Sequence, residues 1–507
     1  MKLLAPVAVA ALTWAQPSSQ QVLSSGAGND TQPILACCHA LESAGLENVV
    51  YPQDDVYQDR VDSYFSVSAR LTPGCIVQPT SSDEVSLAVK TLTYGTTCNF
   101  AVRSGGHTAF PGAANIIDGI TIDLGLMRDT TLDPDTKVAS VQPGPTWSEV
   151  YGALEPYGVT VTGGRTGTVG IGGFLTGGGN NFYAAHHGLG CDNVVNYEVV
   201  LGSGEIVNAN AEENSDLFRA LKGGGSNFGI VTRFDMQAFD AGLLWGGLVT
   251  YNLSTTDQHV DAYINWTDNI ENYPDGSAIV FWSYMPEMGG DVVLAAYEDV
   301  TATERAPAFD EFLAIPGNIS STMRVDSHKN LTDELEIAHG YRNIVFTMTF
   351  KNCKTTFHEI LAQRAQFVSD WTAQSPDGDF YMHGIFQAMP TLFARHAVDK
   401  GGNMLGMDRE EDNAVLFQVQ MMVRSVEQED EARRRLVDLF ASLKRYTVEA
   451  GTDVDWQYYN YADYTQDPLA SYGEDNVAFM KEVACKYDPA GVFQKRMPGG
   501  FKITEVA

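Results

Sequence analysis

Glycine is concentrated in one stretch of this chain. The sequence has 48 glycines in 507 residues, and five clusters of them fall between Arg103 and Gly229. The clusters are RSGGH (103–107), GG (163–164), GIGGFLTGGG (170–179), GLG (188–190) and KGGGSNFG (222–229). Glycine lets backbone N–H groups turn under an anion and approach it closely. A single cluster is better explained as a tight turn in a β-rich domain, but five clusters in one domain favour a large phosphorylated cofactor.

The clusters do not match the common motifs for other cofactors and reactions. Gly170 and Gly172 are followed by Leu175 where G-x-G-x-x-G requires its third glycine, which disfavours a Rossmann dinucleotide site. The chain also has no G-x-x-x-x-G-K-[ST], no H-E-x-x-H and no G-x-S-x-G, so ATP-binding, zinc-protease and serine-hydrolase functions lose their main support. Without C-x-x-C or a cysteine–histidine cluster, no metal site is predicted.

The pattern along the chain predicts an α+β protein. A length of 507 residues fits two or three domains, at roughly 100 to 200 residues each. From Cys75 the sequence reads as strand, capped helix and strand, which is a βαβ-like opening. Beyond about Asp240 the glycine-rich texture ends, and β-like runs alternate with helices. Further strands are predicted at 120–124, 138–142, 194–201, 278–284, 292–297, 344–350 and 414–423, and helices at 36–44, 215–221 and 427–448.

The tail from Trp456 to Phe501 is aromatic and glycine-containing again, as though the chain returns to its first domain. We therefore divide the sequence into a signal peptide (1–18), a cofactor domain (19–242), a substrate domain (243–454) and a returning segment (455–507).

The N-terminus predicts an exported protein, and the net charge limits its partners. An apolar run from Leu3 to Ala15 follows Lys2 and precedes a Gln/Ser stretch, which is typical of a secretory signal peptide. Asn-x-Ser/Thr sequons begin at Asn29, Asn252, Asn265, Asn318 and Asn330. Lys plus Arg is 32 against 64 for Asp plus Glu, a net charge of −32. That charge repels phosphate backbones and anionic lipid, so neither nucleic acid nor a membrane is an expected partner. We expect a monomer.

Several of these motifs occur together in one known family. The stretches VRSGGH (102–107), VQPG (141–144), GGRTGTVGIGGFLTGGG (163–179), GLGCDNV (188–194) and KGGGSNFGIVT (222–232) resemble the berberine bridge enzyme-like flavoproteins. These belong to the vanillyl-alcohol oxidase type of FAD-dependent oxidoreductases. YYNYAD (458–463), Tyr472-Gly473 and KYDPAGVFQ (486–494) are similar to the family's C-terminal pattern, so the resemblance extends from about Cys75 to the end.

The resemblance implies a fold and a covalently held cofactor. It implies a PCMH-type FAD-binding domain of two α/β subdomains, joined to an α+β substrate domain with an antiparallel sheet. In the family the histidine of R-S-G-G-H, here His107, is bonded to the 8α-methyl carbon of FAD. The other cofactor-binding positions implied are Arg103, Ser104, Gly105, Gly106, Thr108, Gly163, Gly164, Thr168, Val169, Gly170, Gly172, Gly173, Gly177, Asp192, Asn193, Val194, Gly229, Ile230, Val231, Tyr458 and Asn460.

Three further positions refine the expected chemistry. Many relatives carry a second flavin link through a cysteine, and Thr166 stands at that position here, so the resemblance implies a single link. Cys191 is interpreted as a buried small residue and not as a substitute linker. Val169 occupies the position of a gate beside the flavin carbon that meets dioxygen, where valine is associated with oxidases. An N-terminal cysteine pairs in the family with the position of Cys98, so we expect Cys98 bonded to Cys37 or Cys38.

The family pattern Y-x-N-Y implies that Tyr461 is the catalytic base. A phenol has an ordinary pKa near 10, so such a base requires a nearby cation or a hydrogen bond from the flavin. Tyr458 and Asn460 correspond to flavin contacts, whereas Tyr459 is better explained as packing between domains. His186 and His187 have no partner visible in the sequence and are more simply explained as surface or pocket-rim residues.

Together these features predict a secreted oxidase. Its substrate would be a small molecule of secondary metabolism, partly because oligosaccharide-oxidising relatives typically carry the second cysteine link. Hydride would pass to covalently bound FAD, and dioxygen would be reduced to hydrogen peroxide. A carbohydrate oxidase is the second hypothesis, and a flavin-binding protein with little turnover is a third.

Overall fold

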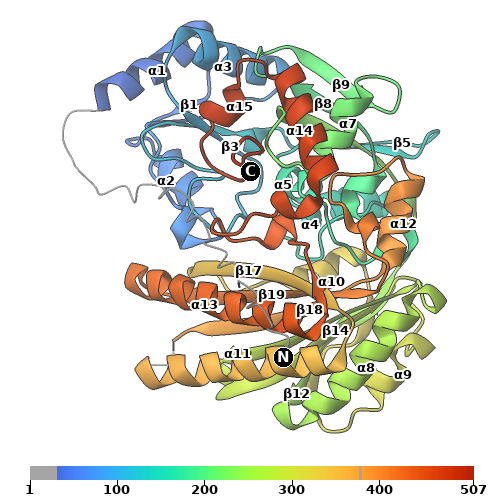
Figure 1. Ribbon diagram of the computed structural model, residues 1–507. Coiled ribbons are helices and arrows are strands. Elements are labelled where there is room, and N and C mark those ends of the chain that lie inside the picture. The colour runs from blue at the N-terminus through green and yellow to red at the C-terminus, as the bar shows by residue number, and fades with distance from the viewer. Residues whose placement is uncertain (1–30, 376–378, 507) are drawn as a thin grey trace, which may run out of the picture.

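The computed structural model describes residues 31–375 and 379–506. The predicted signal peptide and the sequon at Asn29 lie outside these residues. Figure 1 shows two stacked parts, one containing the early strands together with the C-terminal helices, and one built around a large sheet. Among the described helices, none is long and apolar enough to cross a membrane.

The first glycine cluster begins at the end of a strand in a small, mainly parallel sheet. Its order is β1-β2-β4-β3, where β1 (Val49–Val50) is antiparallel to β2. The parallel strands are β2 (Cys75–Val77), β3 (Phe100–Arg103) and β4 (Ile120–Asp123). Helix α3 (Ser82–Gly95) crosses between β2 and β3. It begins where the Ser81 side chain accepts a hydrogen bond from the Glu84 N–H, as an N-cap should. The predicted strand, capped helix and strand are confirmed, and β3 ends at the residue that begins RSGGH.

A second, antiparallel sheet follows two of the remaining glycine clusters, since GLG (188–190) precedes β8 and KGGGSNFG (222–229) precedes β10. Its order is β5-β6-β10-β8-β9. The strands are β5 (Thr130–Asp133), β6 (Val138–Val141), β8 (Val194–Val200), β9 (Ile206–Asn210) and β10 (Ile230–Gln237). The predicted hairpin at Gly202–Gly204 is the β8–β9 turn. Helices α4 (Trp147–Leu154), α5 (Ile171–Thr176) and α7 (Ser215–Leu221) lie in the connections between these strands.

The middle of the chain forms one nine-stranded antiparallel sheet in the order β15-β12-β14-β13-β18-β19-β17-β20, with β16 beside β12. Its long strands are β12 (Leu244–Asn252), β13 (Gly276–Met285), β14 (Gly290–Asp299), β17 (Arg342–Lys351), β18 (Tyr381–Met389) and β19 (Ala414–Val423), and its short ones are β15 (Asn318–Ser321), β16 (Arg324–Asp326) and β20 (Asp453–Val454).

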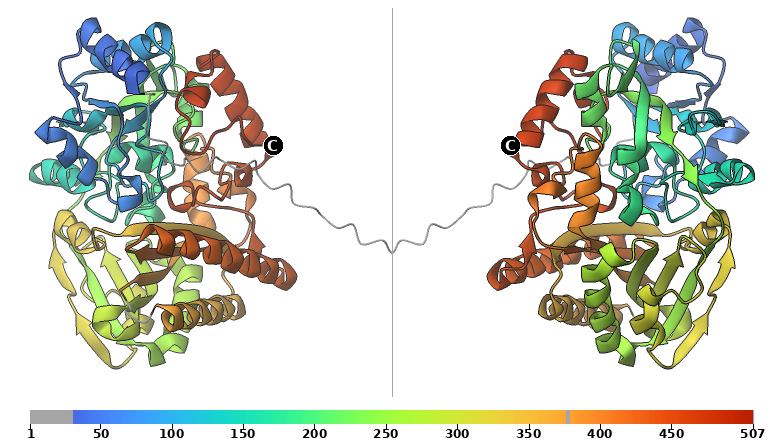
Figure 2. Two further views of the ribbon diagram at one scale, coloured as in Figure 1. Left: turned by 90° about the vertical axis from the view of Figure 1, so that its left-hand side faces the viewer. Right: turned by 90° about the vertical axis from the view of Figure 1, so that its right-hand side faces the viewer.

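Alternation along these strands separates two faces of the sheet. On one face Trp282 and Phe386 pack on Phe357 of helix α11 (Lys354–Gln374). Helices α8 (Thr256–Asn269) and α13 (Val426–Ala450) accompany α11 along the sheet (Figures 1 and 2). The other face presents Phe281 and Ile385 to a cavity described below.

The C-terminal segment packs back onto the first part of the chain (Figure 2). It contains α14 (Glu474–Tyr487) and α15 (Val492–Lys495). The Phe100 N–H donates to the Arg496 carbonyl at 2.8 Å, and Asn227 Nδ2 donates to the Phe501 carbonyl at 3.1 Å. We propose to keep the predicted division of the chain at residues 242 and 454, since both fall between elements.

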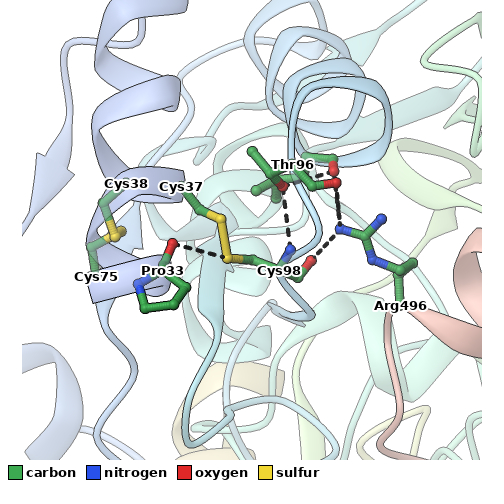
Figure 3. Close-up of a disulfide and its surroundings, with 8 residues drawn as sticks. Pro33, Cys37, Cys38, Cys75, Thr96, Cys98 and Arg496 are labelled. Atoms are coloured by element: carbon green, nitrogen blue, oxygen red, sulfur yellow. Dashed lines mark hydrogen bonds between the residues drawn. A yellow bond between two sulfur atoms is a disulfide. The ribbon is translucent and has the colours of Figure 1, made fainter. Parts of the chain in front are cut away.

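Two disulfides fasten helix α1 (Thr31–Ala44) to the small sheet (Figure 3). Cys37 bonds to Cys98, so the structure selects one of the two partners expected for Cys98. A second bond, between Cys38 and Cys75, was not individually predicted. Cys191 is a buried free thiol, as expected.

Removing the Cys37–Cys98 bond should lower the stability of the protein. The two cysteines are separated by 61 positions, and cross-linking such a long loop restricts the unfolded chain, with a typical effect of about 2–4 kcal/mol. The double variant Cys37→Ser/Cys98→Ser should therefore unfold at lower denaturant. The exposed free thiol of Cys485 supplies the control Cys485→Ser. An unchanged midpoint in the double variant would contradict this assignment.

Candidate functional site

The main cavity lies where the glycine loops, the large sheet and the C-terminal segment meet. Its volume is about 380 Å³. The predicted site residues that line it are Ser104, Gly105, Gly106, His107, Thr108, Gly164, Val169, Gly170, Gly172, Gly173, Gly229, Ile230, Val231, Tyr458, Asn460 and Tyr461. Residues from distant parts of the sequence thus share one cavity.

Two glycine loops contact each other through their backbones at this cavity. A Cβ atom built on Gly105 would lie 2.6 Å from the Gly170 backbone, and one built on Gly170 would lie 2.4 Å from the Gly105 nitrogen. Only glycine fits at both positions. Ser104 fastens the same contact, because its hydroxyl donates to the Pro143 carbonyl at 2.6 Å and accepts from the Gly172 N–H at 3.0 Å.

His107 lies at this loop contact as a neutral imidazole. Its ring stacks on Phe65 with centroids 4.0 Å apart. Burial lowers the pKa of His107 to about 4, so the ring is uncharged at neutral pH. Its Nε2 atom is buried and has no hydrogen-bond partner among the described residues. Such an orphaned atom is uncommon in native structures, and a neutral ring beside a cavity is chemically suited to forming a bond with a cofactor.

Other predicted cofactor positions lie outside the cavity lining, where most of them hold the loops in place. The guanidinium of Arg103 donates to the Arg60 carbonyl at 2.6 Å and stacks over the Tyr64 ring. A Cβ atom on Gly163 would lie 2.1 Å from Trp147. The others outside the lining are Thr168, Gly177, Asp192, Asn193 and Val194.

Three of these residues show how the loops are held. Asp192 Oδ2 accepts from the Leu189 N–H at 2.9 Å, and burial raises the pKa of its carboxyl. Asn193 Nδ2 donates to the Leu189 carbonyl at 2.9 Å. Gly177 leaves room for Asn460, because a Cβ atom there would lie 1.8 Å from Asn460 Oδ1.

The segment with the Y-x-N-Y pattern is a 3-10 turn, η10 (Tyr459–Tyr461), and not a strand. Tyr458, immediately before it, is buried, and its hydroxyl accepts from the N–H groups of Gly179 at 2.7 Å and Asn180 at 2.8 Å. Asn460 Nδ2 donates to the same hydroxyl at 3.1 Å. These bonds connect the C-terminal segment to the third glycine cluster. Burial also raises the pKa of Tyr458, which disfavours a role as a base. We therefore assign this phenol a structural role.

Tyr461 has the cation that a phenolic base requires. Arg165 Nη2 donates to the Tyr461 hydroxyl at 3.3 Å, and that hydroxyl donates to Gln387 Oε1 at 3.5 Å. Arg165 also donates to Gln387 Oε1. Among the described residues that line the cavity, Arg165 has the only ionised side chain. This role of Arg165 was not predicted, although the residue stands inside the glycine motif GGRTGTVG.

The remaining expectations concern residues around the cavity. Thr166 lines it, and its hydroxyl donates to the Leu335 carbonyl at 3.3 Å, so no sulfur stands at the position of the second link. His186 forms an exposed pair with Asp275, and His187 stacks on Phe239. Neither histidine lines the cavity, which fits their interpretation as residues without a catalytic role.

Comparison with known proteins agrees with this geometry. A family model described as an FAD binding domain matches residues 73–210. The chain is 38% identical over 481 residues to "FAD-dependent monooxygenase drtC" of Aspergillus calidoustus, covering 94% of this chain and 91% of the relative. This chain belongs to the berberine bridge enzyme-like family of FAD-dependent oxidoreductases.

Solved structures of the family share its fold. A xylooligosaccharide oxidase from Myceliophthora thermophila superposes with a TM-score of 0.74 at 20% identity, covering 91% of this chain and 98% of the other. A glucooligosaccharide oxidase from Acremonium strictum, whose FAD is described as 6-S-cysteinyl and 8α-N1-histidyl, gives a TM-score of 0.71 at 18% identity over 94% and 98% of the two chains. The solved structures show the PCMH-type fold of the chain, and the FAD binding domain together with the 38% identical relative shows that it is an FAD-dependent oxidoreductase.

Replacing Gly105 should separate the two glycine loops. In Gly105→Ala the new methyl group meets the Gly170 backbone, and overpacking of this kind costs about 1–3 kcal/mol. We expect a lower denaturation midpoint and less FAD per protein after purification. Gly95→Ala is the control, because a Cβ atom there has no neighbour within 4 Å. If Gly105→Ala keeps both full stability and full FAD content, the loop contact is not needed.

Proposed function

We propose that this protein is a secreted oxidase that oxidises a small secondary-metabolite alcohol, or a related substrate, with FAD covalently bound through His107. The observation that carries the proposal is the neutral imidazole of His107, whose Nε2 atom has no hydrogen-bond partner among the described residues, at a cavity lined by glycine loops. When bound, FAD would accept hydride from the substrate and deliver the electrons to dioxygen, which gives hydrogen peroxide.

The residues present fit a flavin nucleotide. Gly105, Gly170 and Gly173 line the cavity and have no Cβ atom, so their backbone can lie close to a pyrophosphate or a flat ring. His107 would hold the 8α carbon. A histidyl link is part of the printed description of the Acremonium strictum enzyme. Because Thr166 has no sulfur, the second, cysteinyl link of that description cannot form at this position.

Tyr461 would take the proton of a substrate O–H or N–H at its phenolic oxygen. Arg165 Nη2 donates a hydrogen bond to that oxygen at 3.3 Å, which places a cation beside the negative charge that the proton transfer would involve. Gln387 Oε1 accepts from Arg165 and so holds the guanidinium toward Tyr461. The largely apolar surroundings strengthen this charge pair relative to water.

Dioxygen is the proposed electron acceptor. Val169 lines the cavity, and the family associates valine at this position with oxidases. The relatives named monooxygenases would instead transfer an oxygen atom to their substrate. An oxidase yields one hydrogen peroxide per substrate oxidised and no oxygen from dioxygen in the product. Peroxide yield and labelling with isotopic dioxygen therefore separate the two reactions.

Export of the protein is supported by its disulfides and by its exposed sequons. Cys37–Cys98 and Cys38–Cys75 are disulfides, which persist in oxidising compartments. Sequons in the described residues lie on exposed positions, namely Asn252, Asn265, Asn318 and Asn330. Both features suit the predicted signal peptide.

Removing His107 should convert the cofactor from covalent to dissociable. His107→Ala lacks the nucleophilic ring, so acid precipitation should leave a colourless pellet and release FAD into the supernatant. The unaltered protein should keep the yellow colour in the pellet. His339→Ala is the control, since His339 is an exposed histidine near the Phe65 ring. Equal release of FAD from the unaltered protein and His107→Ala would contradict covalent attachment here.

Removing the Tyr461 hydroxyl should slow oxidation of the substrate. Tyr461→Phe keeps the ring that packs against Tyr458 but lacks the proton acceptor, and loss of a general base typically costs about 100- to 10,000-fold in rate. Anaerobic flavin reduction measures this step without oxygen chemistry. The control is Tyr464→Phe, at an exposed tyrosine outside the cavity lining. A decrease below about tenfold in Tyr461→Phe would show that another group takes the proton.

A further inference from the structure

The large sheet forms an apolar wall of the cavity that carries a row of side-chain amides. Ile279, Phe281, Val345 and Ile385 supply the apolar surface. Gln387 on β18 and Gln418 and Gln420 on β19 lie on the same face, as the strand pairing of Ile385 with Gln418 requires. An amide has a donor end and an acceptor end, so the orientation of each one determines what the wall can bind.

The orientation of Gln387 is fixed by its neighbours. A guanidinium has only donors, and therefore the atom of Gln387 that faces Arg165 must be its oxygen. Asn180 Nδ2 donates to the same oxygen at 3.2 Å. The amide nitrogen of Gln387 consequently points the other way, where it donates to Gln418 Oε1 at 3.3 Å.

This chain of hydrogen bonds leaves one donor free at Gln418. Gln418 Oε1 already accepts from Gln387 Nε2, and therefore the Nε2 group of Gln418 is the end of this amide that is still able to bind a ligand. No hydrogen bond among the described residues uses this nitrogen, and Gln418 lines the cavity. The position therefore presents an N–H donor to whatever occupies the cavity.

Gln420 presents the opposite group by the same logic. Asn343 Nδ2 donates to the Tyr341 carbonyl at 3.2 Å, so Asn343 Oδ1 faces Gln420 and accepts from its Nε2 at 2.8 Å. The remaining atom, Gln420 Oε1, has no donor among the described residues. Alternate residues of a strand lie about 7 Å apart on one face. The wall thus offers one donor and one acceptor at that spacing, between apolar side chains.

We propose that the substrate is a hydroxylated aromatic carbonyl compound whose carbonyl oxygen accepts from Gln418 and whose hydroxyl group donates to Gln420. This inference rests on the proposed function and names its substrate class. When a carbonyl and a hydroxyl occupy para positions of one aromatic ring, the ring holds their two oxygens rigidly at a distance comparable to the spacing of Gln418 and Gln420. This rigidity lowers the entropy cost of binding. An oligosaccharide has many hydroxyls, and the apolar side chains of this wall would leave most of them without partners.

Binding of matched ligands to the holoenzyme tests this proposal. The probe is 6-hydroxy-1-tetralone, and its partner is 5,6,7,8-tetrahydro-2-naphthol, which has the same rings and hydroxyl without the carbonyl. Cellobiose represents sugars. Each is titrated anaerobically while the visible flavin absorbance and the melting temperature are followed. We expect the ketone to bind about tenfold more tightly than the naphthol, and cellobiose to produce no shift.

Variants of Gln418 assign that preference to the amide. Gln418→Leu should bind the ketone and the naphthol equally within about twofold. Gln418→Glu, which keeps the shape but removes the donor, should bind the ketone less well than the unaltered protein and remains informative if Gln418→Leu does not fold. Gln366→Leu on the exposed side of α11 is the control and should keep the preference.

Three results would overturn the proposal. One is equal binding of ketone and naphthol by the unaltered protein. Another is tighter binding of cellobiose than of the ketone. The third is a flavin spectrum that changes in Gln418→Leu before any ligand is added, because the amide would then contact the cofactor. A protein without flavin would contradict the proposed function alone, since the melting temperature still reports on ligand binding to the amide wall.

Discussion

The contact between the Gly105 and Gly170 backbones is the constraint on which the site depends. It joins the loop after β3 to the start of α5 at a distance that no side chain permits. His107 lies two residues after Gly105, while Arg165, Thr166 and Val169 lie shortly before Gly170. A single backbone contact therefore brings the proposed flavin link, the gate and the cavity's cation to one place. The C-terminal segment completes the arrangement, because the Tyr458 hydroxyl accepts from Gly179 and Asn180 and thereby sets Tyr461 opposite Arg165.

Charge is distributed very unevenly between the surface and this cavity. The chain has a net charge of −32, yet its cavity lining contains one guanidinium and no carboxylate among the described residues. The nearby carboxyl of Glu298 is buried, and burial raises its pKa well above the ordinary value. The hydrogen bond from Arg165 to the Tyr461 hydroxyl lies in largely apolar surroundings, where such a bond is stronger than in water.

The sequence predicts those parts of the structure that depend on local pattern. The capped helix α3, the β8–β9 hairpin and strand β19 follow from turn residues and hydrophobic periodicity, and the glycine motifs locate the cavity. The sequence does not predict the roles of Arg165 and of the amides at Gln387 and Gln418, because these roles arise from strand pairing and side-chain contacts between distant segments. The turn at Tyr459–Tyr461 was not predicted either, since tertiary bonds of Tyr458 and Asn460 hold it. The family resemblance implies that Asp192 and Asn193 bind the cofactor, yet their side chains hold the loop together outside the cavity lining.

The proposed function depends on a covalent bond between FAD and His107, with no other residue bonded to the flavin. Peptide mass mapping of the purified protein after unfolding and proteolysis tests this bond directly. We expect the added mass of FAD on the peptide that contains His107, and unmodified peptides containing Thr166 and Cys191. An unmodified His107 peptide, or flavin recovered on Cys191, would contradict it.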